Sequence, residues 1–319
     1  IVSKGNVTFN GSADIDSYDS SVGPWNAATN RNDRATVATN ATVQVTGNAL
    51  IYGYVATGGT LPNVGSSGRI YGASSPATPL MDTSRVRTDF NANLSDAIAP
   101  TTAATSLGAT YPTSNSSPFT LPRVGDLPGA NGRYLYTCTN LDIAGSSSLT
   151  IAGPVDIIAT GNATVGGSAT LAISGTTALN PSFNLYCPGT IDIGGAGMVN
   201  STSAPLKATI WATKPAGGTP QTVTVSGASA FTGTIYAPNG DVSLSGSGGV
   251  YGAVIGKTVT LSGDTVIHYD EQLLDAVSSG GPTPNSGSLR ISSWSELGAA
   301  AGSGSAFARD NRSPFTSLF

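Results

Sequence analysis

A five-residue phrase that recurs along this chain limits what the chain can fold into. The phrase alternates apolar residues with Thr or Ser and closes on Ser-Gly, and its clearest copies are Val223–Gly227, Val242–Gly246 and Val259–Gly263. The closing glycines are 19 and then 17 residues apart. Alternation with a period of two predicts short strands with one buried face. A nearly fixed interval with glycine at each corner predicts coils that stack on one another.

Related phrases recur over residues 1–73 and 133–268. The further copies are Val7–Gly11, Val43–Gly47, Leu141–Gly145, Leu149–Gly153, Ala163–Gly167, Leu171–Gly175 and Ile191–Gly195. We therefore predict an all-β fold and, within that class, a parallel β-solenoid in which roughly nine coils at about 4.8 Å spacing form a rod of about 45 Å. A β-sandwich is the alternative, since it explains short strands equally well, although it does not explain why one phrase recurs.

The same pattern divides the chain into four parts. Residues 1–73 form the first β-repeat part, 74–132 a helix and loop insertion, 133–277 the main β-solenoid, and 278–319 a linker (Gly280–Gly287), a docking strand (Leu289–Leu297) and a C-terminal tail. Within the insertion, Leu80–Ile98 carries apolar residues at helical spacing and ends before Pro100, so we predict a helix there. We also expect His268–Val277 to form a short helix that closes the last coil.

The composition bears on the location and partners of the protein. Charged residues make up 10% of the chain, the net charge is −4 and no basic run occurs, which argues against a nucleic-acid partner. A surface rich in Ser, Thr and Asn instead of Lys and Glu indicates an extracellular protein. No apolar run reaches about 18 residues, the length that a transmembrane helix needs. The chain opens without Met and already in strand pattern, so we expect an upstream segment, through which alone the chain would meet a membrane.

The sequence allows two interpretations of the two cysteines. Cys138 and Cys187 each follow a Tyr within a strand-like run. An extracellular location would permit a disulfide between them. The other interpretation is that both are buried free thiols, because the sequence does not fix the distance between the two residues.

Two groups of residues invite an enzymatic reading. Asp142 and Asp192 occupy the same place in their phrases, so both are expected to point outward from neighbouring coils, either as an acid pair or as solvated strand positions. His268 is the only histidine, and it could serve catalysis or close the end of the coils. The sequence holds no Gly-x-Ser-x-Gly motif and no second histidine for a zinc site, so we favour the structural role for His268.

A third group has the composition of a cation site. Asp14, Asp16 and Asp19 are closely spaced carboxylates that could bind Ca²⁺, or could cap backbone N–H groups in a turn. The Gly and bidentate Glu of an EF-hand are missing, which favours the turn. We therefore predict no catalytic, cofactor-binding or metal-binding residue in this chain.

Threonines at the outward position of the phrase raise the possibility of a regular hydroxyl row. Thr224 and Thr260 share one place in the phrase, with Ser243 between them. Regular Thr rows on flat solenoids can bind ice. The same place holds Gln44, Asp142, Ala172 and Asp192 in other copies, so we expect the row to be broken. Asn-x-Ser/Thr sequons such as those at Asn6, Asn40, Asn93 and Asn162 leave glycosylation open.

Three stretches carry a resemblance to a known family. They are GTIYAPNGDVSLSGSGGVYGAVIGKTVTLSGDTVIHYDEQL at 233–273, SWSEL at 293–297 and VSKGNVTFNGSADIDSYDSSVGPW at 2–25. They resemble the domain that follows the N-terminal membrane helix in pilus-assembly-like proteins of Gram-negative bacteria with a PilX-type N-terminus. The resemblance implies a surface-exposed, pilus-associated or envelope protein without known catalysis. The stretch at 2–25 resembles the family's first segment after that helix.

These observations lead to one functional expectation and one alternative. We expect a non-enzymatic, extracellular structural or adhesive protein of the bacterial envelope, associated with a pilus or filament and acting through a stiff β-rod. Its partners would be further copies of itself, pilus or envelope proteins, or a glycan surface, and the apolar tail Ser313–Phe319 is a candidate contact segment. The alternative is a polysaccharide-active β-helix enzyme.

Overall fold

The computed structural model of the chain describes residues 1–73, 79–113, 118–174, 179–227, 230–274 and 291–294. Strands are by far the most common regular structure among these residues and helical turns are few, so the all-β prediction is confirmed. The first run of strands is β1 (Val2–Ser3), β2 (Val7–Gly11), β3 (Asp14–Tyr18), β4 (Ala35–Thr39), β5 (Val43–Val45), β6 (Leu50–Ala56), β7 (Asn63–Val64), β8 (Arg69–Tyr71), β9 (Val86–Arg87) and β10 (Ala92–Leu94).

The second run of strands begins beyond residue 104. It comprises β11 (Thr105–Tyr111), β12 (Pro118–Leu121), β13 (Tyr134–Ile143), β14 (Ser148–Ile151), β15 (Pro154–Ala159), β16 (Ala163–Val165), β17 (Thr170–Ile173), β18 (Ser182–Cys187), β19 (Ile191–Ile193), β20 (Met198–Asn200), β21 (Ala208–Ala212), β22 (Gln221–Val225), β23 (Phe231–Gly246), β24 (Gly249–Gly263) and β25 (Val266–Asp270). The short β26 (Ile291–Trp294) follows, and the 3₁₀ turns are η1 (Thr83–Arg85) and η3 (Pro205–Lys207).

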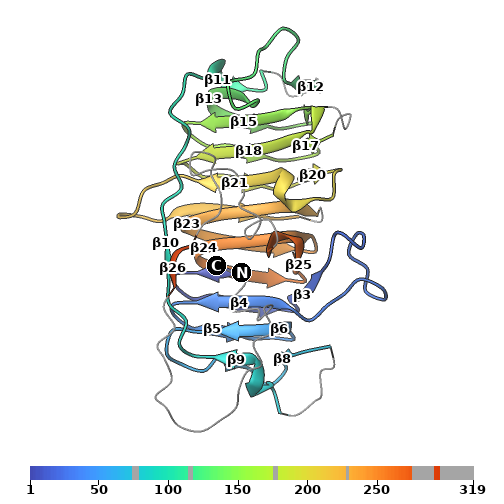
Figure 1. Ribbon diagram of the computed structural model, residues 1–319, viewed down its shortest axis with the longest axis vertical. Helices are drawn as coiled ribbons and strands as arrows, with labels where there is room; N and C mark the ends of the chain where they lie inside the picture. Colours follow the sequence, from blue (N-terminus) through green and yellow to red (C-terminus); the bar gives the residue numbers. More distant parts are fainter. Residues whose placement is uncertain (74–78, 114–117, 175–178, 228–229, 275–290, 295–319) are drawn as a thin grey trace.

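Equivalent phrases lie above one another as parallel, in-register neighbours. Val223 pairs with Val242, and Val242 pairs with Val259. Long strands such as β24 and β6 each pair with several other strands. Parallel pairings therefore form a closed ring, which runs from β24 through β25, β3, β6, β4 and β1 back to β24. Parallel strands therefore lie one above another in layers along the long axis of the molecule (Figure 1).

The closing glycines line up along one edge of this stack. A Cβ atom on Gly246 would lie 2.3 Å from the carbonyl oxygen of Gly227, and one on Gly263 would lie 3.1 Å from that of Gly246. All three glycines have positive φ, at 105°, 101° and 75°. The predicted alignment is confirmed, because each corner turns through a backbone conformation that a side chain disfavours and sits against the corner below.

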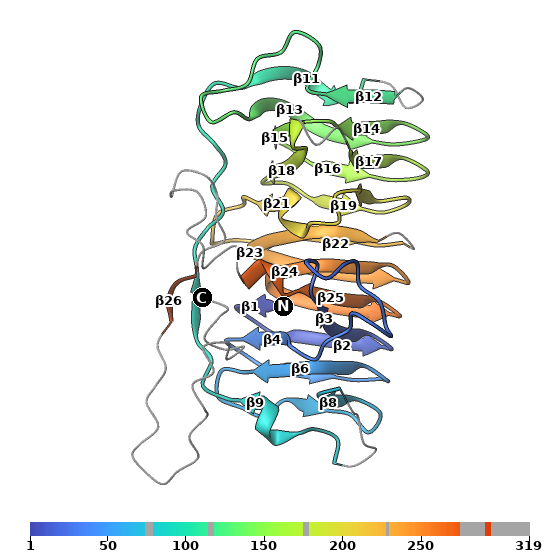
Figure 2. The same ribbon diagram turned by 45° about the vertical axis from the view of Figure 1, so that its right-hand side comes forward.

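The order of the coils in space differs from their order in the sequence. Strands β1 to β3 pair with β24 and β25 on one side and with β4 to β6 on the other. The chain therefore starts in the middle of the stack and builds coils toward one end (Figure 2). A flank segment, residues 88–104, then runs along the side to the far end, and β11 to β25 return to the starting point.

The helix predicted over Leu80–Ile98 is wrong. The segment holds η1, β9 and β10 and is otherwise extended. Phe90, Ala92 and Leu94 are buried against the flank of the stack, with exposed residues between them. Residues four positions apart lie on the same face in a helix and also in a strand. The spacing that predicts a helix here therefore belongs to a strand-like segment. Residues 105–121 are not an insertion either, since β11 and β12 pair with β13 and β14.

The C-terminal predictions have mixed outcomes. His268 lies in β25 and not in a helix, and the helical turn that follows covers residues 272–274. Within the predicted docking strand, Ile291–Trp294 forms β26, which pairs antiparallel with β10. Gly280–Gly287 and Ser313–Phe319 lie outside the described residues. Among the described residues, none of the helical segments has the length and hydropathy to cross a membrane.

The core consists of inward-facing aliphatic columns that run through the stack. Val7, Val43, Val223, Val242 and Val259 are each at most 1% exposed, and they occupy equivalent places in their coils. Burying such a side chain fully contributes about 1.5–3 kcal/mol relative to leaving it in water. The repeated valine is therefore what makes successive coils adhere, and it leaves the alternate residues of each strand on the outer surface.

Candidate functional site

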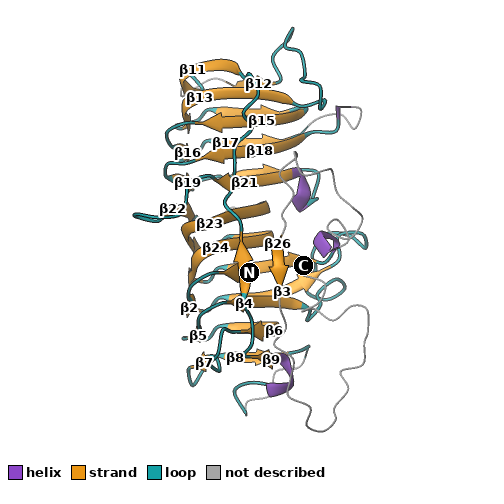
Figure 3. Cartoon of the chain, turned by 60° about the vertical axis from the view of Figure 1, so that its left-hand side comes forward, coloured by secondary structure: helices purple, strands orange, loops and turns teal. Residues whose placement is uncertain are grey.

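The outward residues of five neighbouring strands form a continuous polar row. The strands β22, β23, β24, β2 and β5 lie one above another (Figure 3), and their registers place five side chains in line, which we call the central row. The central row is Thr224, Ser243, Thr260, Thr8 and Gln44. Neighbours in the row are about 4.8 Å apart, as the spacing of paired strands requires.

Two further rows flank the central row on the same strands. On one side lie Thr222, Asp241 and Thr258, and on the other Ser245, Ser262 and Asn10. We call these residues together with the central row the hydroxyl face. Residues two positions apart on a strand are about 6.7 Å apart, so the hydroxyl face presents polar groups at regular intervals in two directions.

The side chains of the central row have no hydrogen-bond partner among the residues that the structure describes. The flanking rows are different: Thr258 donates to the carboxylate of Asp241 over 2.7 Å, and Thr46 donates to the Asn10 side chain over 3.0 Å. Asp241 is the one ionisable residue of the hydroxyl face. The face thus offers uncharged groups that can each donate and accept a hydrogen bond, and its middle is available to a ligand.

The row is less broken than the sequence indicates. Ala172 pairs with Thr150 and Val199, so it belongs to a different sheet from the hydroxyl face. Above Thr224 the column continues through Asp192. The hydroxyls are therefore uninterrupted from Thr224 to Thr8, because β2 from the beginning of the chain continues the row that β24 would otherwise end.

Asp142 and Asp192 do not lie on neighbouring coils, where both were expected to point outward. Asp142 pairs with Thr164, and Thr164 pairs with Asp192, so one coil separates the two aspartates. Two steps of strand spacing place their backbones about 10 Å apart on the same outward face. Paired carboxylates that hydrolyse glycosides flank the scissile bond at about 5–9.5 Å. Asp142 and Asp192 are therefore two outward positions on one surface with a threonine between them, and not adjacent members of one column.

His268 lies at the junction between the first and last coils, and not at the end of the stack. Its Nδ1 atom is 2.5 Å from Oδ1 of Asp16, and both side chains are at most 5% exposed. The indole of Trp25 stacks on the imidazole with ring centroids 3.9 Å apart, and the Tyr251 ring is tilted against the imidazole at 4.7 Å. The histidine is thus in contact with two aromatic rings. We call this group, with Arg31, the junction cluster.

The carboxylate of Asp16 has further partners from the loop between β3 and β4. Arg31 Nε lies 3.0 Å from its Oδ2, and Trp25 Nε1 donates to its Oδ1 over 3.1 Å. The Arg31 guanidinium also covers the Tyr52 ring at 3.8 Å. Because β25 and β3 are 252 residues apart at the His268–Asp16 contact, the junction cluster joins the two ends of the repeat region.

The three aspartates considered for calcium do not converge. Asp16 is occupied as above, and Asp19 accepts hydrogen bonds from Ser21 and Gln272. The Ser21 hydrogen bond lowers the pKa of Asp19, whereas burial raises the pKa of Asp14. Nowhere in the described ranges do three or more His, Cys, Asp or Glu side chains gather in a geometry that could hold a metal ion.

The two cysteines are buried free thiols. Cys138 pairs with Ala159 in the next coil, and the register of β15 with β18 places Cys187 one coil further on. Two coils separate their backbones by about 10 Å, which is too far for a disulfide. Burial raises the pKa of each thiol to about 11, so both are weak nucleophiles at neutral pH.

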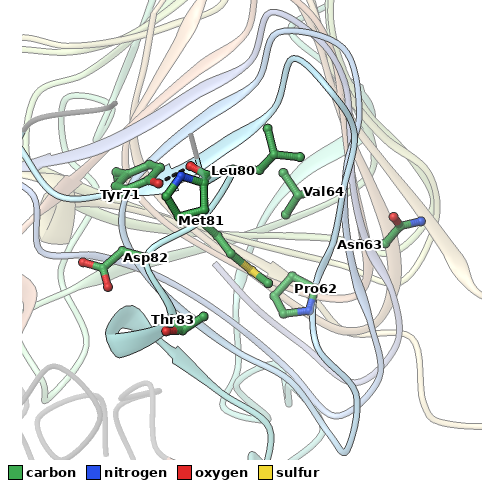
Figure 4. Close-up of a pocket in the computed structure, with 9 residues that line it drawn as sticks. Pro62, Asn63, Val64, Tyr71, Leu80, Met81, Asp82 and Thr83 are labelled. Carbon is green, nitrogen blue, oxygen red and sulfur yellow. Dashed lines mark hydrogen bonds between the residues drawn. The ribbon is translucent and has the colours of Figure 1, made fainter. Parts of the chain in front are cut away.

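A pocket that the sequence gives no sign of lies at the end of the stack where β7 and β8 are. Its volume is about 750 Å³, and Figure 4 shows the side chains that line it. Val64, Leu80 and Met81 line it, and the hydroxyl of Tyr71 donates to the carbonyl of Pro79 at its rim. The lining comes from Pro62 and strand β7, from Tyr71 of β8 and from the segment 79–83. We call it the end pocket.

Comparison with known proteins gives one match. A family profile described as a domain of unknown function (DUF7305) matches residues 82–276. Curated proteins and solved structures give no match. The matched range contains β11 to β25 and with them the upper part of the hydroxyl face, whereas β2 and β5 lie before it.

Proposed function

The chain belongs to the DUF7305 family, and we propose that it is a non-enzymatic structural and adhesive protein of the bacterial cell surface. In this proposal a β-solenoid rod carries the hydroxyl face and holds it against an uncharged glycan. The observation that carries the proposal is the central row, with five polar side chains in register and no hydrogen-bond partner among the described residues.

The pairing of the strands is evidence for the proposed rod. Every pairing within the large sheet is parallel, and the glycine corners lie against one another from coil to coil. A repeat in which each coil contacts its neighbours on both sides is the arrangement of a solenoid. Such a rod needs no charged surface for its own packing, which agrees with a charged content of only 10%.

The chemistry of the hydroxyl face favours a neutral, polyhydroxylated partner. Asp241 is its one ionisable side chain and is hydrogen-bonded to Thr258, so the face has no cations to attract nucleic acid, anionic lipid or acidic glycans. Sugar hydroxyls donate and accept hydrogen bonds as the face does. Single hydrogen bonds of this kind are weak, but a row that engages a repeating polymer at several places gains affinity through multivalency.

The surface location and the pilus association rest on the sequence. The low charge and the abundance of Ser, Thr and Asn favour an extracellular protein. The resemblance over residues 2–25 and 233–297 adds the envelope and pilus context. Pilus or envelope proteins are then the protein partners, and further copies of the chain are a third class.

Binding to insoluble glycans tests the proposal. The wild-type protein should sediment with at least one neutral insoluble polysaccharide, such as cellulose or chitin, and the variant T224V/T260V should lose about tenfold in affinity, the effect of about 1.4 kcal/mol. The control T150V/T170V changes two threonines outside the hydroxyl face, on β14 and β17, and should bind as wild type does. Equal binding by both double variants would refute the role of the face.

The same preparations test the enzymatic alternative. The assay measures reducing ends released from neutral and acidic polysaccharides. We expect none above the buffer control. Release that persists in T224V/T260V and increases with protein concentration would favour a polysaccharide-active enzyme and overturn the proposal.

A further inference from the structure

Three side chains with complementary reactivity meet on the flank of the stack. The side-chain nitrogen of Lys4 donates to Oδ1 of Asn239 over 3.0 Å, and Nδ2 of Asn239 donates to Oδ1 of Asp96 over 2.7 Å. Lys4 follows β1, Asn239 lies in β23, and Asp96 belongs to the flank segment. We call these three residues the amide triad. An amine, a carboxamide and a carboxylate in a row supply a nucleophile, an electrophilic carbon and a proton carrier.

The fold holds the Asn239 side chain between the other two members of the triad. Its Nδ2 also donates to the Lys214 carbonyl over 3.1 Å, which fixes the plane of the amide. The Tyr236 hydroxyl donates to the Ser95 carbonyl over 2.6 Å and anchors the flank segment next to Asp96. The carboxylate is therefore held at the nitrogen that would leave if the amide were attacked.

The surroundings of Lys4 favour its reactive form. Only the neutral amine is a nucleophile, and a lysine becomes one when its charged form is disfavoured. Burial lowers the pKa of Lys4 and the charge of Lys257 lowers it further, whereas Asp96 opposes the shift in part. Because Nζ of Lys4 already lies 3.0 Å from Oδ1 of Asn239, a small movement brings it to the Cγ atom that carries this oxygen.

We propose that Lys4 and Asn239 join in an intramolecular amide cross-link, with Asp96 as the catalytic residue. Nζ of Lys4 attacks Cγ of Asn239, so the Nζ–Cγ bond forms and the Cγ–Nδ2 bond breaks. Asp96 accepts one proton from Nζ and delivers it to Nδ2, which leaves as ammonia. One amide replaces another, so the reaction needs no oxidant, reductant or further reactant.

The cross-link would connect parts of the stack that the chain does not connect directly. Lys4 and Asn239 are 235 positions apart. Strand β1 pairs with β24, and β24 pairs with β23, so the link spans three neighbouring strands where the start of the chain enters the middle of the stack (Figure 2). Closing so long a loop covalently restricts the unfolded chain, as disulfides do in other extracellular proteins.

A second Lys–Asn pair in this chain provides a matched comparison. Lys207 donates to Oδ1 of Asn180 over 2.7 Å, so its amine is as close to a side-chain amide as that of Lys4. Within the part of the chain that the structure describes, no carboxylate contacts Asn180. We therefore expect the Lys207–Asn180 pair to stay unreacted.

Mass spectrometry of the purified full chain tests the proposal. The intact mass should be lower than the sequence mass by one ammonia molecule. Trypsin should release one species in which Ile1–Arg31 is joined to Ala208–Lys257, because the linked Lys4 is no longer cleaved. K4R and D96N should each lose the joined species, whereas K207R should keep it. Circular dichroism should show that all three variants are folded.

The variant K4R also excludes a different loss of ammonia. Asn239 precedes Gly240, and an Asn-Gly pair can close on its own backbone to a succinimide. That reaction does not use Lys4, so it would continue in K4R and would join no peptides.

Three outcomes would overturn the proposal: folded wild-type protein with no joined peptides, ammonia loss in K4R equal to that in wild type, or a Lys207–Asn180 link as abundant as the Lys4–Asn239 link. Joined peptides that form equally in D96N would overturn the role of Asp96. K4R leaves the hydroxyl face unchanged, so it should bind the glycan as wild type does, which separates this test from that of the proposed function.

Discussion

The glycine edge of the stack makes a quantitative prediction about stability. Substituting Gly246 by Ala should destabilise the protein for two reasons. Its φ of 101° lies where side chains are strained, at about 1–3 kcal/mol. The added Cβ would also lie 2.3 Å from the Gly227 carbonyl oxygen, and relieving such a contact by moving the backbone costs about 1–3 kcal/mol more. We expect a total near 4 kcal/mol.

Two matched substitutions separate these causes. Gly132 has a φ of 75° but open space around its Cβ position, so G132A should cost about 1–2 kcal/mol from the backbone alone. Gly166 has open space and no positive φ, so G166A should be neutral or stabilise the fold by about 0.4–1 kcal/mol. Urea denaturation followed by circular dichroism gives the three values. If G246A proved no worse than G132A, the coils could not be in contact at this corner, and the reasoning would fail.

Two further predictions concern buried ionisable groups. Burial raises the pKa of Cys138 and Cys187 to about 11 from 9.0; the unfolded chain therefore ionises first, and the free energy of unfolding should fall between pH 9 and 11 by up to about 3 kcal/mol for each thiol. The variant C138A/C187A should show a shallower decline in its urea midpoint over this range, and an unchanged decline would contradict the assignment. Replacing Asp16 by Asn leaves Arg31 and the imidazole without their carboxylate, so it should cost about 3–5 kcal/mol, whereas the control D192N, on an exposed residue, should cost nothing measurable.

The sequence predicts the corners and the core because both are local. A phrase of alternating apolar residues that ends in Gly predicts which side chains face inward and where the chain turns. Val242 is buried and Gly246 has a positive φ, as the phrase requires. The helix prediction fails for a related reason. The four-residue interval from Phe90 to Leu94 fits the period of a helix and that of a strand. Ala92 between them is buried as well, which indicates a strand, but its burial is visible only in the structure.

The candidate sites could not be predicted because they depend on which coils become neighbours. No pattern in the sequence shows that β2 lies beside β24, yet this pairing places Thr8 next to Thr260 and completes the central row. The same arrangement brings Asp16 to His268, whereas the sequence alone predicts that His268 closes the end of the coils. The end pocket depends on how the segment 79–83 folds against β7 and β8, and that segment carries no copy of the phrase.

The position of the first coil explains why the junction cluster carries charge in a protein that otherwise has little. Within a run of consecutive coils, each repeat is followed by a chain-connected neighbour, and aliphatic columns and glycine corners suffice to align them. Between β25 and β3 no short connection exists, since the contact joins residues 252 positions apart. Side chains at this junction therefore add to the glycine corner and the valine column in fixing the register. A buried carboxylate that bonds to an imidazole, a guanidinium and an indole at once fits one register only, because a shift by one residue would turn Asp16 into the core and leave its three partners unpaired.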